Sequence, residues 1–112
     1  MSDTSFTMED RLARLEAVIA ERRVAEPSTS YVASLAQKGR SKMAQKLGEE
    51  ATETVIAAIQ DNREEVVKEG ADLLFHLACL LADMDLSFAD ILAELDRREG
   101  TSGLTEKASR TA

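Results

Sequence analysis

The sequence predicts an all-α protein, a bundle of four to five helices in one domain. Apolar residues recur three or four positions apart along most of the chain, which is the spacing of one helix face. The 112 residues include only five Gly and one Pro, so little interrupts the helices. Three Phe, one Tyr and no Trp leave Leu, Ala, Val and Ile to fill the core, a composition that favours packed helices over a sheet.

Charge and cysteine content exclude several classes of protein. Twenty-one acidic residues against 14 basic ones give a net charge of −7, and such a surface repels nucleic-acid backbones. Cys79 is alone, which excludes an internal disulfide and a cysteine-rich zinc site. The longest mostly apolar segment, residues 73–82, is about half of what a bilayer crossing needs. We therefore expect a soluble cytoplasmic protein with no nucleic-acid or membrane partner.

The first part of the chain is predicted to form a helix, a linker and a short helical piece. Thr7 is suited to cap a helix over about residues 8–23. Pro27 marks a linker, because proline does not fit inside a helix. A short helical piece over residues 31–38 then ends at Gly39.

Two long helices are predicted in the middle of the chain. Residues 41–61 carry one apolar stripe, composed of Met43, Leu47, Ala51, Val55, Ala58 and Ile59. Asn62 caps a second helix over residues 63–82, which runs antiparallel to the first after a tight turn. Its segment 73–82 is apolar almost all the way round, so it must be covered on several sides.

A last helix and a polar tail complete the predicted domain. Ser87 begins this helix and Gly100 ends it. Residues 101–112 are polar and rich in Ser and Thr. We expect one domain over residues 1–112, with its core in about 8–100.

Five acidic residues gather on the two long helices: Glu49, Glu50 and Glu53 on the first, Glu69 and Asp72 on the second. Glu50 and Glu53 lie one turn apart on one side, and Glu69 and Asp72 repeat that spacing. In an antiparallel pair Glu53 faces Glu69, and four carboxylates point into one gap. Like charges so placed raise each other's pKa unless a cation neutralises them.

The ligand types indicate which cation this is. Oxygen ligands without His or Cys suit Mg²⁺, with Mn²⁺ as a possible substitute. Magnesium usually takes its remaining ligands from substrate phosphates, and water made acidic on a metal attacks phosphate anhydrides. Lys46 and Lys42, one and two turns before the glutamates, are placed to hold the far end of a polyphosphate.

A simpler interpretation is open for some of these residues. Lys46 can reach Glu50, and Lys42 can reach Glu49, as surface ion pairs on one helix. Glu69 and Asp72 favour a metal site, because they directly precede the most apolar run of the chain, where an unpaired carboxylate is costly. His76, one turn after Asp72, is either a general base or helper of the site, or a core residue with one hydrogen bond.

Two segments resemble motifs of a known superfamily. Residues 46–53 read KLGEEATE and residues 69–77 read EGADLLFHL. They are similar to the EExxE and ExxD motifs of the all-α MazG-like nucleotide pyrophosphohydrolases. The resemblance is strongest to the phosphoribosyl-ATP pyrophosphatase branch and covers about residues 12–110. The further matching segments are 15–19, 30–35, 39, 42–46 and 102–110.

The resemblance implies a fold, a reaction and partners. The fold is a MazG-like bundle completed by dimerisation. The reaction is hydrolysis of 1-(5-phospho-β-D-ribosyl)-ATP to phosphoribosyl-AMP and pyrophosphate, the second step of histidine biosynthesis, with magnesium as cofactor. The cyclohydrolase of the next step, which needs zinc-binding cysteines, is expected on a separate chain. The alternatives are a housekeeping hydrolase of (d)NTPs and, in another class, a non-catalytic helical dimerisation module.

The resemblance also implies roles for residues. The implied metal ligands are Glu50, Glu53, Glu69 and Asp72. Glu49 completes the motif and binds a second ion or orients water. The implied phosphate contacts are Lys42 and Lys46. Contacts to the phosphoribosyl end are expected from Tyr31, Arg97, Lys107 or Arg110.

Overall fold

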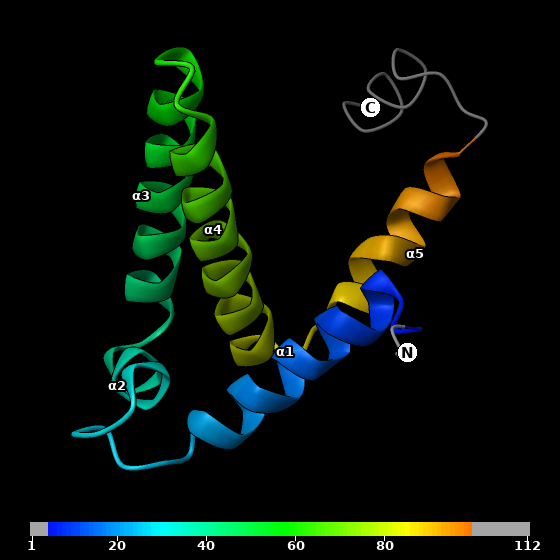
Figure 1. The fold of residues 1–112 in the computed structure, drawn as a ribbon. Coiled ribbons are helices and arrows are strands. Elements are labelled where there is room, and N and C mark those ends of the chain that lie inside the picture. Colours follow the sequence, from blue (N-terminus) through cyan, green and yellow to red (C-terminus); the bar gives the residue numbers. More distant parts are fainter. Residues whose placement is uncertain (1–4, 100–112) are drawn as a thin grey trace, which may run out of the picture.

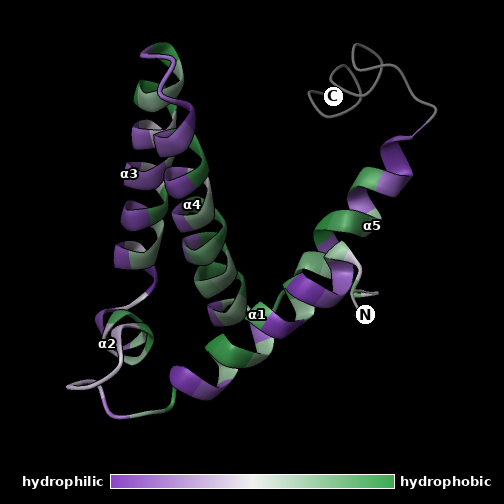
Figure 2. Cartoon of the chain, in the orientation of Figure 1, coloured by the Kyte–Doolittle hydropathy of each residue, from purple (hydrophilic) through white to green (hydrophobic). Residues whose placement is uncertain are grey.

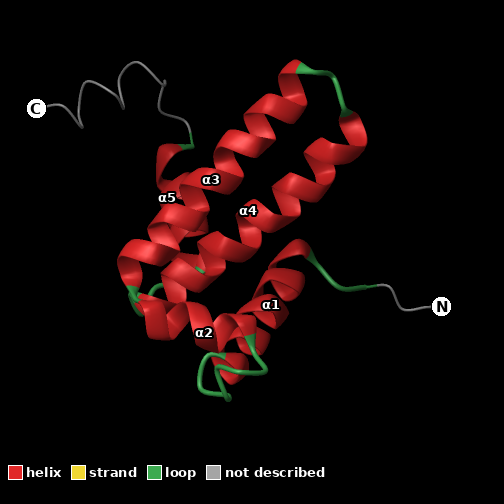
Figure 3. Cartoon of the chain, turned by 90° about the vertical axis from the view of Figure 1, so that its left-hand side faces the viewer, coloured by secondary structure: helices red, strands yellow, loops and turns green. Residues whose placement is uncertain are grey.

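The computed structural model describes residues 5–99, and this part of the chain contains five helices joined by turns and linkers. They are α1 (Met8–Arg22), α2 (Tyr31–Lys38), α3 (Arg40–Ile59), α4 (Arg63–Asp83) and α5 (Phe88–Arg98) (Figure 1). No strand occurs within that range (Figure 3). The all-α class is therefore confirmed, whereas Gly100 and the tail at 101–112 lie outside the described residues.

Capping side chains mark the starts of α1, α2, α4 and α5, as the sequence predicts, whereas α3 begins after Gly39 without one. Thr7 and Asp10 form a reciprocal pair of 3.0 Å hydrogen bonds at the start of α1. Ser30 and Asn62 each accept a backbone N–H, at 3.1 Å, at the starts of α2 and α4. Ser87 opens α5 with a capping box. Each cap satisfies donors that a helix end leaves without a partner.

α3 and α4 form the antiparallel pair that positions the site, and their contact is the most extensive between any two helices described. α3 ends at Ile59, two residues before the predicted end, because Asp61 turns the chain with a φ of 57°. α1 packs against α4 and also contacts α2 and α5. α2 packs against α3 and α4, close to where α3 begins (Figure 1).

The core lies at the end of the pair where α1 and α2 join it. It consists of Ile19, Val32, Leu35, Met43, Ala78, Cys79, Leu81 and Phe88. The end of α4 is held by two arginines there. Arg23 Nη1 donates to the Ala82 carbonyl at 2.9 Å, and Arg40 Nε donates to Asp83 Oδ2 at 2.7 Å. These bonds satisfy acceptors at the helix C-terminus.

The other end of the α3–α4 pair leaves apolar side chains uncovered. Val55, Ile59 and Val67 are 56%, 81% and 72% exposed. Hydrophobic ribbon extends along both helices toward the connecting turn (Figure 2). The predicted stripe of α3 is thus buried only near Met43, because α1, α2 and α5 do not extend over the tip. Leu74 is also half-exposed, so the apolar middle of α4 is only partly covered.

No helix between residues 5 and 99 combines the length and the apolar character that crossing a membrane requires.

Candidate metal centre

Three carboxylates from α3 and α4 come together between the two helices. One oxygen each from Glu50, Glu69 and Asp72 lies within 4.8 Å of the others. Glu50 is buried at 7% exposure, Glu69 is half-buried and Asp72 is exposed. The helix register explains the position of Glu50. It shares the buried face of α3 with Met43 and Ala57, seven residues away on either side, which is two helical turns.

Two oxygens of this cluster have no hydrogen-bond partner. Oε1 of Glu50 and Oε1 of Glu69 are buried, and no donor within residues 5–99 reaches either atom. The nearby Glu50 carboxyl raises the pKa of Glu69 to about 7, and burial and the Glu53 and Glu65 carboxyls add to that rise. Buried oxygens of this kind are usually paired, and a hard divalent cation is the partner that oxygen ligands suit. The residues present therefore fit a metal ion.

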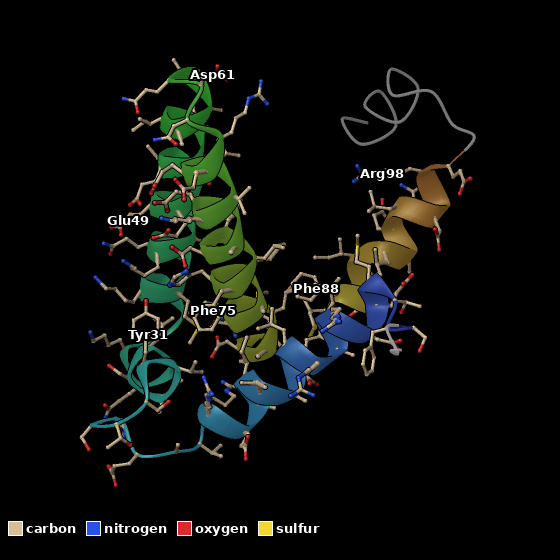
Figure 4. The ribbon with its side chains drawn as sticks, in the orientation of Figure 1. Tyr31, Glu49, Asp61, Phe75, Phe88 and Arg98 are labelled. Atoms are coloured by element: carbon tan, nitrogen blue, oxygen red, sulfur yellow. The ribbon has the colours of Figure 1, made fainter. Side chains whose placement is uncertain are left out.

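Glu53 and Glu49 lie outside this group of three. Glu53 is exposed, and its carboxyl adds to the raised pKa of Glu69, so it borders the cluster. Glu49 accepts a 2.8 Å hydrogen bond from Gln45 and a 3.2 Å ion pair from Lys46, contacts that lower its pKa. Both glutamates line a shallow hollow of about 520 Å³ on the outer side of α3. Figure 4 labels Glu49 on that side.

The two lysines differ in their surroundings. Lys46 makes a surface ion pair with Glu49, whereas the simpler interpretation pairs it with Glu50, and the hydrogen bond to Glu49 raises the pKa of Lys46. Lys42 is half-buried, and its ammonium makes no hydrogen bond or ion pair with the residues described. Its charge lowers the pKa of Glu49, so both cations act on the same hollow. Charge pairing therefore accounts for Glu49, whereas Glu50 has no such cation.

His76 makes two hydrogen bonds where the core interpretation expects one. Nδ1 lies 2.8 Å from the Asp72 carbonyl oxygen, and Nε2 lies 2.8 Å from the Tyr31 hydroxyl. Because a carbonyl only accepts, Nδ1 of the neutral ring donates, and the Tyr31 hydroxyl donates to Nε2. Sequence spacing gives no signal for this pair, since its members lie 45 residues apart. The bond joins α2 to α4 beside the carboxylates.

Arg97, another expected contact of the phosphoribosyl end, is not brought to the cluster. Arg97 lies on α5 and binds Glu94 through two hydrogen bonds of 3.1 and 2.7 Å. α5 rises away from the α3–α4 pair (Figure 1). Lys107 and Arg110 lie outside the described residues.

Comparison with known proteins gives one consistent family. A family model described as phosphoribosyl-ATP pyrophosphohydrolase matches residues 12–99. A phosphoribosyl-ATP pyrophosphatase of Novosphingobium aromaticivorans is 65% identical over 100 residues, which is 89% of this chain and 94% of the relative. That of Rhizorhabdus wittichii is 65% identical over 103 residues, 92% and 97% of the two chains. That of Zymomonas mobilis is 56% identical over 102 residues, 91% and 95% of the two chains.

Proposed function

The chain belongs to the phosphoribosyl-ATP pyrophosphohydrolase family, and from that premise we propose how its residues serve the reaction. The protein is a hydrolase that acts on a phosphoanhydride. It converts 1-(5-phospho-β-D-ribosyl)-ATP to phosphoribosyl-AMP and pyrophosphate, the second step of histidine biosynthesis. The observation that carries the proposal for the site is the pair of buried, unpartnered oxygens on Glu50 and Glu69.

Glu50, Glu69 and Asp72 hold a divalent ion, Mg²⁺ in this proposal, with Glu53 as a further ligand. What supports this is the 4.8 Å grouping of three carboxylates and the position of Glu53 beside Glu69. A divalent ion bound there supplies positive charge to the substrate phosphates and acidifies coordinated water. The protein contributes the fixed position of the ligands, because Glu50 is locked on the buried face of α3.

The remaining charged residues of α3 bind and orient. Lys42 and Lys46 contact the phosphates, and their ammonium groups offset the charge that develops on the departing pyrophosphate. Glu49, held by Gln45 and Lys46, orients the attacking water from the hollow. Support for these roles comes from the position of Lys42, Lys46 and Glu49 along one side of α3, next to the cluster.

The partners and compartment belong to the proposal as well. The substrate is a small nucleotide, and the functional unit is a homodimer in the cytoplasm. Support for the dimer comes from the exposed apolar side chains at the tip of the α3–α4 pair. A cyclohydrolase on a separate chain stays a prediction.

The experiment is a measurement of pyrophosphate release from phosphoribosyl-ATP, with ATP and dCTP in parallel, in magnesium and in excess chelator. We expect magnesium-dependent turnover of phosphoribosyl-ATP and little turnover of the other two nucleotides. Preference for ATP or dCTP would identify a housekeeping hydrolase instead. No pyrophosphate release from any of the three nucleotides would indicate a non-catalytic module.

A further inference from the structure

A cavity of about 410 Å³ lies where the end of α1, the α1–α2 linker, α2 and α4 meet. Its lining includes Arg22, Ser30, Tyr31 and Phe75. None of these residues belongs to the group of carboxylates that fits the metal. The cavity is therefore a second feature of the molecule, separate from the residues that fit the metal.

Tyr31 connects the cavity to the cluster. The residue is 51% exposed and lines the cavity, while its hydroxyl bonds to His76, one turn after Asp72. Burial raises the pKa of Tyr31, Lys46 lowers it, and the charges of Glu50 and Glu49 raise it further. The hydroxyl thus stays protonated and lies within the field of both lysine and carboxylates. Tyr31 therefore connects the cavity with the charged side chains of α3.

The wall of the cavity next to the cluster is aromatic. The rings of Tyr31 and Phe75 are nearly parallel, at 27°, with centroids 6.2 Å apart. Figure 4 shows the two side chains close together where α2 approaches the α3–α4 pair. The chain has three Phe, one Tyr and no Trp, so half of these aromatic residues line this one cavity. Flat rings with an open face bind planar heteroaromatic groups.

Arg22 supplies the positive charge of the cavity. Its guanidinium makes no hydrogen bond or ion pair with any residue between 5 and 99. The Ser30 hydroxyl donates to the Arg22 carbonyl at 3.1 Å, which holds the linker against the end of α1. A planar cation with five donors suits a phosphate group, which it binds through two parallel hydrogen bonds.

We propose that this cavity binds the phosphoribosyl-adenine end of the substrate, with the adenine against Tyr31 and Phe75 and the 5-phosphate of the added ribose at Arg22. The inference rests on the proposed function. Phosphoribosyl-ATP differs from ATP only by the phosphoribosyl group, so a cation that contacts this phosphate separates the two nucleotides. Arg22 is therefore a specificity-determining residue, and it acts at the end of the substrate opposite to the bond that is cleaved.

The single tyrosine provides a direct probe. The chain contains one Tyr and no Trp, so its intrinsic fluorescence comes from Tyr31 alone. We would titrate the whole protein, in magnesium, with phosphoribosyl-AMP, AMP and ribose 5-phosphate. A parallel titration of N-acetyltyrosinamide corrects for light that the nucleotides absorb. We expect both nucleotides to quench the emission and ribose 5-phosphate to leave it unchanged, because only the adenine stacks on the ring.

Matched arginine variants test the phosphate contact. Arg22→Ala should weaken phosphoribosyl-AMP binding by about tenfold or more and leave AMP binding unchanged, as the loss of one charge-assisted contact requires. Arg14→Ala, about two turns earlier on α1, is the control and should alter neither affinity. With phosphoribosyl-ATP as substrate, Arg22→Ala should raise KM while kcat is retained. Phe75→Leu should weaken the binding of both phosphoribosyl-AMP and AMP.

Each contrary result has a defined meaning. Calorimetric binding of phosphoribosyl-AMP without quenching overturns the placement of adenine on Tyr31, and so does absence of binding at millimolar concentration. Equal effects of Arg22→Ala on the two nucleotides overturn the phosphate contact. If the wild-type protein hydrolyses phosphoribosyl-ATP in any of these cases, only the cavity assignment fails. If it does not hydrolyse that substrate, the proposed function fails, whatever the fluorescence shows.

Discussion

Glu50 is the carboxylate whose surroundings most require a cation. It is 7% exposed, it lies on the buried face of α3, and its Oε1 has no donor within the described range. Asp72 and Glu69 meet it from α4. A charge in this position costs free energy unless it is paired. Magnesium binding should therefore stabilise the folded protein by mass action.

Charge-removing variants test this assignment. Glu50→Gln and Asp72→Asn should each lower kcat by more than about tenfold, because losing a metal ligand costs more than about 1.4 kcal/mol of transition-state stabilisation. Both should also abolish the rise in Tm on adding magnesium. Glu49→Gln is the control for binding, since Glu49 is held by Gln45 and Lys46 outside the group, and it should keep the rise in Tm. An unchanged rise in Glu50→Gln would remove Glu50 from the ligand set.

The raised pKa of Glu69 makes stability depend on pH. The folded pKa of about 7 exceeds the ordinary value of 4.5, so the folded state binds the proton more tightly than the unfolded state. This contribution is fully present below about pH 4.5 and is lost as the pH rises to about 7. In metal-free protein we expect Glu69→Gln to flatten the fall in unfolding free energy over this window, measured by urea denaturation. A fall of equal size in the variant would contradict the prediction.

Proton competition should also appear in metal binding. Because a carboxylate must lose its proton to bind a cation, the magnesium affinity should decrease as the pH drops below about 7. Magnesium and protons thus stabilise the cluster in opposite pH ranges. Calorimetric titrations at pH 6 and 8, within one unit of that pKa, measure this, and equal affinities would argue against Glu69 as a ligand.

At the scale of elements, the sequence predicts the positions of the helices well. It predicts less well how α3 is rotated about its own axis. Helix starts follow from local capping chemistry, so Thr7 and Asn62 are visible in the sequence. Which glutamate of α3 faces α4 depends on the whole buried face of the helix. Glu50 lies on it with Met43, whereas Glu53 is rotated about 60° away. Spacing of three residues alone does not separate the two.

The contact between Tyr31 and His76 marks what the sequence does not reveal. The two residues lie on α2 and α4, and their bond exists because α2 packs against the end of the pair. No periodicity connects positions 45 residues apart. Packing between elements, which sequence patterns describe only as apolar faces, decides such contacts.

The break between α2 and α3 rests on a glycine. Gly39 has φ 101° and ψ 173°, a conformation that residues with a Cβ avoid at a cost of about 1–3 kcal/mol. A Cβ at Gly39 meets none of the described residues within 4 Å, so the cost expected there is backbone strain. Gly39→Ala should therefore lower the free energy of unfolding by about 1 kcal/mol or more.

A helical glycine provides the control of opposite sign. Gly48 lies inside α3, and a Cβ there also meets no atom of residues 5–99 within 4 Å. Gly48→Ala should raise the free energy of unfolding by about 0.5–1 kcal/mol, because alanine loses less backbone entropy in a helix. Urea denaturation of both variants measures the difference. Destabilisation by both would place a neighbour near Gly48 that the single chain does not contain.

At the scale of the molecule, the single chain is open. Its radius of gyration is 16.5 Å, against about 13 Å for a compact domain of about 100 residues. The α3–α4 pair extends beyond α1 and α2, and α5 points away from it (Figure 1). Five exposed apolar side chains lie along the pair: Val55, Ile56, Ile59, Val67 and Leu74. An apolar face of this kind in a charged protein is typical of an interface.

A second copy of the chain is the occupant that we propose for this face, because two α3–α4 pairs related by a two-fold axis bury the same side chains against each other as one bundle. The wild-type protein should sediment at twice the 12.2 kDa of one chain. Val67→Asp should shift it toward the single chain, since a buried, unpaired carboxylate is costly in an apolar interface. Val24→Asp, on the exposed linker at 82% exposure, carries the same change outside the face and should leave the dimer intact. Sedimentation of the wild-type protein as one chain at micromolar concentration would contradict the dimer, and equal dissociation in both variants would place the interface elsewhere.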